Sequence, residues 1–198
     1  MKKQTVLLVF TICTMALSFA QTSSKTQEKL TINTSKSEIK WSADYAFYFG
    51  GHYGTIMFKE GFFIKSNDVI SGGEFVIDMH SIKNTDIEKE DANLSLVDHL
   101  KDGDFFDVKK FPTAKLIITN VIYHDPTHMK IIADLTIKGK TMPIDFQAEV
   151  DFKTKQMLTK FKIDRTRWEI NYGSKSLKEN LQNSVISDAI GFEVKLSL

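Results

Sequence analysis

Apolar and polar residues alternate along most of the chain from Leu30 onward. Residues 144–152 show the pattern most clearly, with apolar side chains at Ile144, Phe146, Ala148, Val150 and Phe152. A two-residue period is typical of a β-strand that has one dry face and one solvated face. Residues 129–137 and 190–198 repeat the period. These three segments are therefore predicted to be strands whose apolar faces form a core.

Five further segments are predicted to be strands, most of them bounded by Gly, Asn, Asp or Pro: residues 38–46, 55–65, 70–79, 115–123 and 157–164. About eight strands result, and the fold class is all-β. A single open sheet with one apolar face would expose that face and two edges, whereas closure into an antiparallel barrel removes both problems. A β-sandwich is the competing architecture.

Residues 81–113 interrupt the strand pattern. Asn93 is predicted to cap a short helix in which Leu94, Val97 and Leu100 lie on one side, and Gly103 is predicted to end it. We expect this helical segment to close one end of the barrel.

The first twenty residues have the composition of a signal peptide. Lys2 and Lys3 precede an apolar run of twelve residues, 6–17, which ends before Ser-Phe-Ala. A bilayer-spanning helix needs about 20 apolar residues, so cleavage after Ala20 is favoured over a retained anchor. Residues 21–29 are polar and are predicted to be a flexible leader, and residues 30–198 a single domain. The protein is expected in the periplasm or secreted.

Removal of residues 1–20 changes the chemistry that the chain can carry. It leaves 178 residues with 24 basic and 25 acidic side chains, and it removes Cys13, the only cysteine. Disulfides, thiol catalysis and thiolate metal sites are therefore excluded. No basic stripe suited to phosphate backbones is present, so nucleic acid is not an expected partner.

Several short motifs succeed one another along the chain: Trp41, GHYG at 51–54, GGEFVIDM at 72–79, HL at 99–100 with DFFD at 104–107, FPTA at 111–114, LTIKG at 135–139 and IDRT at 163–166. In this order they resemble the motifs of the YceI-like family, across nearly all of the chain after the signal peptide. The resemblance implies an extended lipocalin-like, eight-stranded antiparallel barrel, usually periplasmic. It also implies an interior that holds a polyisoprenoid or another long-chain amphiphile. The segment 45–50 (YAFYFG) is more aromatic than the family pattern.

The candidate ligand-binding residues lie on the inward faces and at the expected mouth: Phe47, His52, Phe105, Phe106, Ile131, Ala133, Leu135, Phe146, Ala148, Ile163, Arg165, Trp168 and Phe192. Four of these are candidates for the mouth: Phe47, Phe105, Phe106 and Trp168. Arg165 could hold a polar head group or form a surface salt bridge. Periodicity alone favours a barrel filled by its own side chains, and the family resemblance favours an open lumen.

The two clearest alternating segments are joined by a short link, residues 139–142, and are predicted to form a hairpin. Pairing Lys138 with Pro143 would place Ala133 opposite Ala148, and Lys130 opposite Asp151 on the outer face. The facing alanines would leave a notch, which we interpret as lumen. A two-residue shift would keep the same faces inward.

The leading hypothesis is a non-catalytic carrier of an isoprenoid or other lipid, with no cofactor, no metal and no stable membrane insertion; a homodimer is left open. The first alternative is a lipid-modifying enzyme that uses His99 with Asp98, Asp104 and Asp107. The second is an interaction protein with a filled barrel. His124 and His128 have ligand-like spacing, but Asp125-Pro126 between them indicates a turn.

Overall fold

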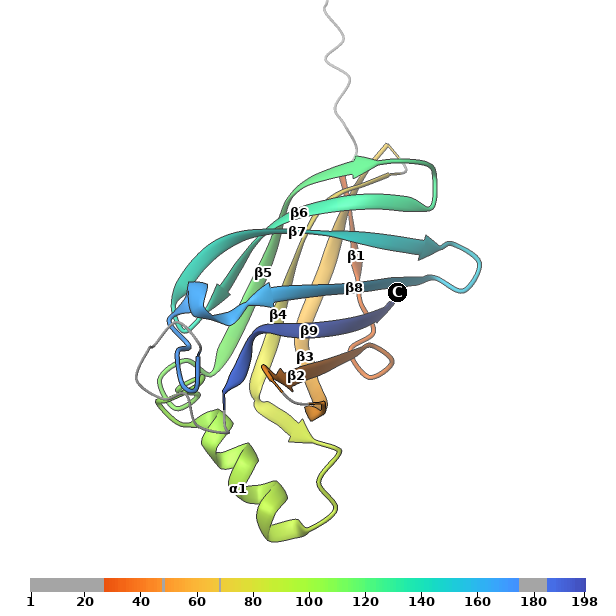
Figure 1. Cartoon of the computed structure of the whole chain (residues 1–198). Helices are drawn as coiled ribbons and strands as arrows, with labels where there is room; N and C mark the ends of the chain where they lie inside the picture. Colours follow the sequence, from red (N-terminus) through yellow and green to blue (C-terminus); the bar gives the residue numbers. More distant parts are fainter. Residues whose placement is uncertain (1–26, 48, 68, 175–184) are drawn as a thin grey trace, which may run out of the picture.

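The computed structural model describes residues 27–47, 49–67, 69–174 and 185–198, and Figure 1 shows them as one antiparallel β-barrel. The strands are β1 (Gln27–Thr31), β2 (Glu38–Tyr45), β3 (Gly51–Ser66), β4 (Val69–Asn84), β5 (Thr113–Tyr123), β6 (His128–Ile137), β7 (Lys140–Asp151), β8 (Gln156–Asp164) and β9 (Ile186–Ser197). A helix, α1 (Glu90–Lys101), follows β4, and a short 3-10 helix, η1 (Arg165–Trp168), follows β8.

Strands β2 to β9 close the barrel. Each pairs with its neighbour in the order β3-β2-β9-β8-β7-β6-β5-β4, and pairing of β3 with β4 completes the ring. The predicted eight-stranded antiparallel barrel is confirmed. A ninth strand, β1, pairs with the second half of β3 beside the barrel. Residues 27–29, predicted to be part of a flexible leader, belong to this strand because their backbone groups pair with residues 64–66 of β3.

The hairpin of β6 and β7 has the predicted faces but a different register. Ile131, Ala133, Leu135 and Ile137 alternate as buried residues along β6. Ala133 lies opposite Ile144, however, and Ala148 lies opposite Met129, so the predicted pairing of the two alanines is wrong. Lys130 correspondingly lies opposite Gln147 rather than Asp151.

The different register results from the length of the turn. Ile137 pairs with Lys140, so only Lys138 and Gly139 connect the strands. Both have positive φ, 49° and 72°. Two consecutive left-handed residues form the tight turn whose twist matches a β-hairpin. The turn thus ends three residues earlier than the predicted four-residue link, and the facing-alanine notch does not exist.

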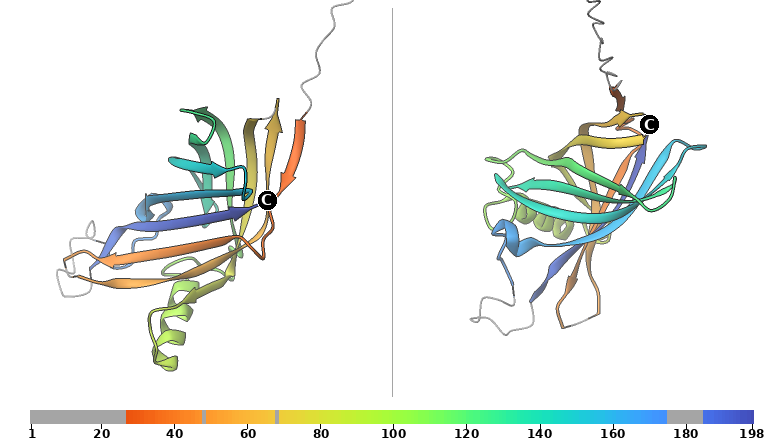
Figure 2. Two further views of the ribbon diagram at one scale, coloured as in Figure 1. Left: turned by 90° about the vertical axis from the view of Figure 1, so that its right-hand side faces the viewer. Right: turned by 90° about the horizontal axis from the view of Figure 1, so that it is seen from above.

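The helix lies at one end of the barrel, below it in Figure 1 and clearly outside the strands in Figure 2. It begins at Glu90 rather than at Asn93. The Asn93 amide instead donates to the backbone oxygens of Asn84 and Ile87, at 3.2 and 2.9 Å. Asn93 therefore fastens the helix to the end of β4 and does not cap it. None of the helices in the described ranges is long and apolar enough to cross a bilayer.

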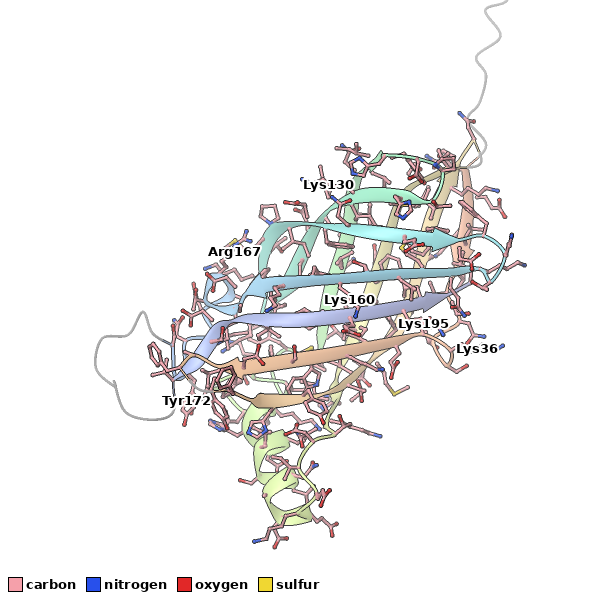
Figure 3. All side chains as sticks on the ribbon, turned by 45° about the vertical axis from the view of Figure 1, so that its right-hand side comes forward. Lys36, Lys130, Lys160, Arg167, Tyr172 and Lys195 are labelled. Atoms are coloured by element: carbon pink, nitrogen blue, oxygen red, sulfur yellow. The ribbon has the colours of Figure 1, made fainter. Side chains whose placement is uncertain are left out.

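The outer face of the barrel is charged. Figure 3 shows Lys130 of β6, Lys160 of β8 and Lys195 of β9 projecting outward. Lys160 pairs with Glu193 across β8 and β9 at 2.7 Å. Exposed ion pairs of this kind contribute about 0 to 1 kcal/mol, so the barrel is stabilised mainly by the apolar side chains on its inner face.

Candidate ligand-binding lumen

The barrel encloses a cavity of about 170 Å³. Each of the strands β2 to β9 contributes side chains to its wall, together with Leu100 of α1 and with Phe105 and Phe106 after it. Cavities of roughly 150 Å³ lined by aliphatic and aromatic residues stay dry and take up apolar guests. The interior is therefore an apolar lumen, and the barrel is not completely filled by its own side chains.

The lumen is long. Along β8 and into η1, its wall runs from Met157 to Arg165, which is roughly 26 Å of strand at about 3.3 Å per residue and about 20 Å along the axis of a barrel whose strands tilt by about 40°. Phe146, Phe161 and Phe192 form a row of rings across β7, β8 and β9, with centroids 4.6 and 5.4 Å apart. An extended hydrocarbon chain fits a wall of this length better than a compact molecule.

The two ends of the lumen differ. At the end beside β1, lining residues such as Phe63 and Met157 are almost completely buried. Met129 and Val150 pack beyond them, also buried, and close this end. At the end beside α1, Leu100, Phe106 and Ile186 line the wall and remain partly exposed. We infer that the mouth of the lumen is at the α1 end.

The surface that lines the lumen is apolar throughout. Among the described lining residues, three carry a side-chain nitrogen or oxygen: Trp41, Thr159 and Arg165. The Trp41 indole N–H donates to the Thr55 carbonyl oxygen at 3.3 Å. The Thr159 hydroxyl donates to the Gln147 carbonyl oxygen at 2.6 Å, so its methyl group is left for the lumen. With these donors engaged by backbone, the wall can hold hydrocarbon but offers no hydrogen bond to a polar group.

Arg165 is buried at the α1 end, and its guanidinium is satisfied by backbone. Nη1 donates to the carbonyl oxygen of Ile170 at 2.7 Å, and Nε and Nη2 donate to those of Ser187 and Ile186 at 3.2 and 3.4 Å. Asp188 lies 3.6 Å away. Burial lowers the pKa of Arg165, partly offset by the neighbouring carboxylates. Arg165 thus ties η1 to the start of β9 and contributes its aliphatic stem to the lumen.

The predicted site residues fall into three groups in the structure: residues that line the lumen, buried residues outside the lining, and residues outside the lining that are at least partly exposed. Seven of them line the lumen: Phe105, Phe106, Ile131, Leu135, Phe146, Arg165 and Phe192. Ala133, Ala148 and Ile163 are buried but lie outside the lining. Phe47 is 62% exposed on the β2–β3 turn.

Trp168, expected at the mouth, is fully buried and does not line the lumen. Its indole N–H donates to the Leu135 carbonyl oxygen at 3.0 Å. The side chain is therefore anchored against β6, where it packs η1 onto the barrel. Position 168 is a structural contact in this fold and not part of the entrance.

Sequence reasoning missed several lining residues. Ile39, Trp41 and Ala43 of β2 alternate regularly, and their period could have identified them. Phe58 and Ile77 were harder to find, because register shifts between β3 and β4 interrupt the alternation there. Bulges of this kind add a residue to one strand and reverse the face on which the later residues of that strand lie.

Two histidine clusters lie apart from the lumen wall. One donor atom each from His99, Asp102 and Asp104 fall within 4.8 Å of one another, so these residues could hold a cation, although both carboxylates are exposed. The His99 ring contacts Phe105 and does not itself line the lumen. His128 Nδ1 lies 2.9 Å from Asp125 Oδ2 in the β5–β6 turn, which is the turn that the sequence indicated.

A polar relay lies at the α1 end of β2, β3 and β4. The Tyr45 hydroxyl is 3.2 Å from His52 Nε2, and His52 Nδ1 is 2.8 Å from Asp86 Oδ2. Burial would raise the pKa of Asp86, but hydrogen bonds from the Tyr53 backbone N–H, His52 and Asn84, together with the charge of His52, outweigh it and lower the pKa. Asp86 is therefore ionised at neutral pH.

A closed antiparallel barrel around an apolar lumen places this chain in the class of lipocalin-like β-barrels with an internal cavity. It belongs to the YceI-like family, since residues 30–198 match the family model of the YceI-like domain.

The relatives agree with this assignment. A UPF0312 protein of Vibrio vulnificus is 32% identical over 119 residues, which cover 54% of this chain and 63% of that protein. The match thus spans less than two thirds of the relative's length. The crystal structure of Burkholderia cenocepacia BcnA superposes with a TM-score of 0.59 at 18% identity, over 83% of this chain and 98% of that one. A Campylobacter jejuni YceI protein gives a TM-score of 0.51 at 19% identity, over 98% and 96%. At such identities the two structures show the fold alone.

Proposed function

We propose that this protein binds a long-chain apolar molecule, such as a polyisoprenoid, an isoprenoid quinone or a fatty-acid-like lipid, and carries it without chemical change. The observation that supports the proposal is the apolar lumen, whose wall runs from Met157 to Arg165 and opens at one end. A long lipid is insoluble in water because its chain is apolar. The lumen offers the chain a matching surface.

The energetics of chain burial support this ligand class. Each methylene transferred from water contributes about 0.8 kcal/mol, so ten methylenes contribute roughly 8. Association costs an estimated 4 to 15 kcal/mol, and a preformed cavity reduces the part of that cost that comes from ordering the protein. A chain of ten or more carbons is therefore needed for useful affinity, and short apolar molecules should bind weakly.

The proposal includes export. Residues 1–20 have the pattern of a signal peptide and lie outside the described residues, so their cleavage is an inference from sequence. The proposed place of action is the periplasm or the medium. Intact mass of the exported protein should show a chain that starts at Gln21, and full-length protein recovered from the membrane fraction would contradict this.

The experiment that tests the carrier function blocks the lumen. Val194 lines the lumen and is partly exposed to it, whereas the next residue, Lys195, projects from the outer face (Figure 3). We expect native mass spectrometry of the freshly purified protein to show a bound lipid. Val194→Trp should lose this lipid while unfolding at a similar denaturant concentration, because the indole occupies existing space.

The matched control is Lys195→Trp, which adds the same ring outside the barrel and should retain the lipid. Lipid loss in both variants, or in neither, would contradict binding in the lumen. The enzyme alternative is tested with the same preparation: His99→Ala should leave the bound lipid unchanged, and chemical conversion of the lipid by the parent but not by the variant would contradict a pure carrier.

A further inference from the structure

The polar end of the lipid cannot be held inside the lumen. The wall is apolar throughout, and the N–H groups of Arg165, the charged residue among the described lining residues, point to the carbonyl oxygens of Ile170, Ile186 and Ser187. Transfer of a hydroxyl into apolar surroundings without a hydrogen bond costs about 1 to 7 kcal/mol. A ligand with a polar head group is therefore bound with its chain inside and its head at the mouth.

Tyr45 and His52 are polar side chains beside the part of the lumen lined by Ala43 and Ile186. Ala43 lines the lumen and lies directly opposite His52. Directly opposite residues of an antiparallel pair share a face of the sheet. The pairing of β2 with β9 shifts register between Ala43 and Tyr45, but the Tyr45 hydroxyl lies 3.2 Å from His52 Nε2, so Tyr45 is on the same side as His52. Tyr45 also pairs with Ile186, a lining residue at the mouth. Both side chains therefore extend the lumen face past its last apolar residues.

The ionised Asp86 carboxylate determines which nitrogen of His52 carries a proton. The ionised carboxylate of Asp86 accepts from the Tyr53 backbone N–H and the Asn84 amide, and it can only accept. His52 Nδ1 must therefore carry the proton that it shares with Asp86. When the imidazole is neutral, the other nitrogen, Nε2, is an acceptor, and the Tyr45 hydroxyl can donate to it. The Tyr45 oxygen is left with lone pairs, so it can accept one further hydrogen bond.

Building on the proposed carrier function, we propose that Tyr45, oriented by His52 and Asp86, is the head-group site and that it selects long-chain lipids with a neutral hydrogen-bond donor, such as an alcohol or an amide. The head donates to the Tyr45 oxygen. A carboxylate or phosphate head has no proton to donate, and the negative charge of Asp86, held 2.8 Å behind His52, repels it. Arg165 is too well satisfied to compensate.

The test compares geranylgeraniol with its methyl ether, which has the same isoprenoid chain and no donor. Affinities are measured by displacement of a fluorescent long-chain alcohol. The protein should bind the alcohol about two- to tenfold more tightly than the ether, which is the contribution of one neutral hydrogen bond. Tyr45→Phe should lower the affinity for the alcohol to the affinity for the ether. The affinity for the ether should stay unchanged.

Tyr53→Phe is the matched control, because the Tyr53 side chain is exposed on the neighbouring strand β3, on the face opposite to that of His52. It should retain the preference for the alcohol. Equal affinity of the parent for alcohol and ether would overturn the head-group site while leaving the carrier function intact. Equal weakening of both ligands by Tyr45→Phe would also overturn it, since that is the result of a structural role. Absence of binding for both ligands would overturn the carrier function itself.

Discussion

Arg165 is buried in the wall of a lumen that offers no polar surface. Two of its three backbone hydrogen bonds connect η1 to residues 186–187 at the start of β9, and the third is to the Ile170 carbonyl oxygen. An arginine can make this connection because its planar fork holds several donors in fixed directions. A charged residue among the lining residues is thus compatible with a lumen that binds only hydrocarbon.

Arg165→Met should lower the free energy of unfolding by about 2 to 4 kcal/mol, since it leaves buried carbonyls and Asp188 without their partner. Urea denaturation would measure the loss. Arg167→Met, a matched change at an exposed arginine with one hydrogen bond to the Pro143 carbonyl, should cost at most about 1 kcal/mol. Folded Arg165→Met should still bind geranylgeraniol more tightly than its methyl ether. Equal affinities for the two ligands would contradict a purely structural role for Arg165.

Asp86 makes stability depend on acidic pH. Its pKa is lowered in the folded protein, so its contribution is present above the ordinary aspartate pKa of about 3.9 and is lost as the pH falls through the lower folded value. Asp86→Asn should therefore have a lower free energy of unfolding than the parent at pH 7. This difference in unfolding free energy should become smaller as the pH falls. Denaturant midpoints at a series of pH values would measure it, with exposed Asp44→Asn as the control. A difference in unfolding free energy that does not change with pH would contradict the claim that hydrogen bonds to the ionised Asp86 carboxylate stabilise the fold.

The β6–β7 hairpin depends on the left-handed residue Gly139. A Cβ at this position would have φ +72° and would approach the Phe111 ring to 2.9 Å. Gly139→Ala should destabilise the protein by about 1 to 2 kcal/mol, the cost of a left-handed conformation with a side chain. Gly103→Ala, where a Cβ meets nothing within 4 Å, should change stability by less than about 0.5 kcal/mol. Thermal or urea unfolding of the pair would measure the difference, and equal effects would contradict the assigned turn.

Which faces of the strands are buried could be predicted from the sequence, but the pairing between strands could not. The alternation from Ile144 to Val150 reports burial directly, because each apolar side chain needs a dry face. Register depends on the turn, and Lys138 gives no sequence signal that it will adopt positive φ, which is uncommon for a residue with a side chain. β1 was missed for a related reason: four of its five residues are exposed, so it has no apolar period to detect.

The lumen is a property of the whole barrel and was predicted only by family resemblance. An alternating strand looks the same whether its apolar face meets other side chains or a cavity. The position of Trp168 outside the wall depends on the path of η1, which no local pattern specifies. The Tyr45–His52–Asp86 relay joins residues up to 41 positions apart in sequence, on β2, on β3 and in the segment after β4, so its geometry required the closed barrel.

Ligands should stabilise the folded barrel in proportion to how far they fill it. A ligand that binds only the folded state raises the unfolding free energy by RT ln(1 + [L]/Kd). At equal concentrations, geraniol, farnesol and geranylgeraniol should raise the melting temperature in that order, because each added isoprene unit buries more chain. Differential scanning fluorimetry would measure the series. A shift that does not depend on chain length would contradict a lumen filled along its axis.

Both ends of the barrel domain lie away from the mouth. β1 begins at Gln27 opposite Ser66, and Leu198 donates its backbone N–H to Lys155; both contacts are beside the closed end of the lumen. A barrel tethered to a surface through Leu198, or through the chain ahead of Gln27, would therefore present its opening away from that surface. Such a tether would leave lipid exchange unobstructed, and an affinity tag at either position can be used for immobilised binding assays without covering the entrance.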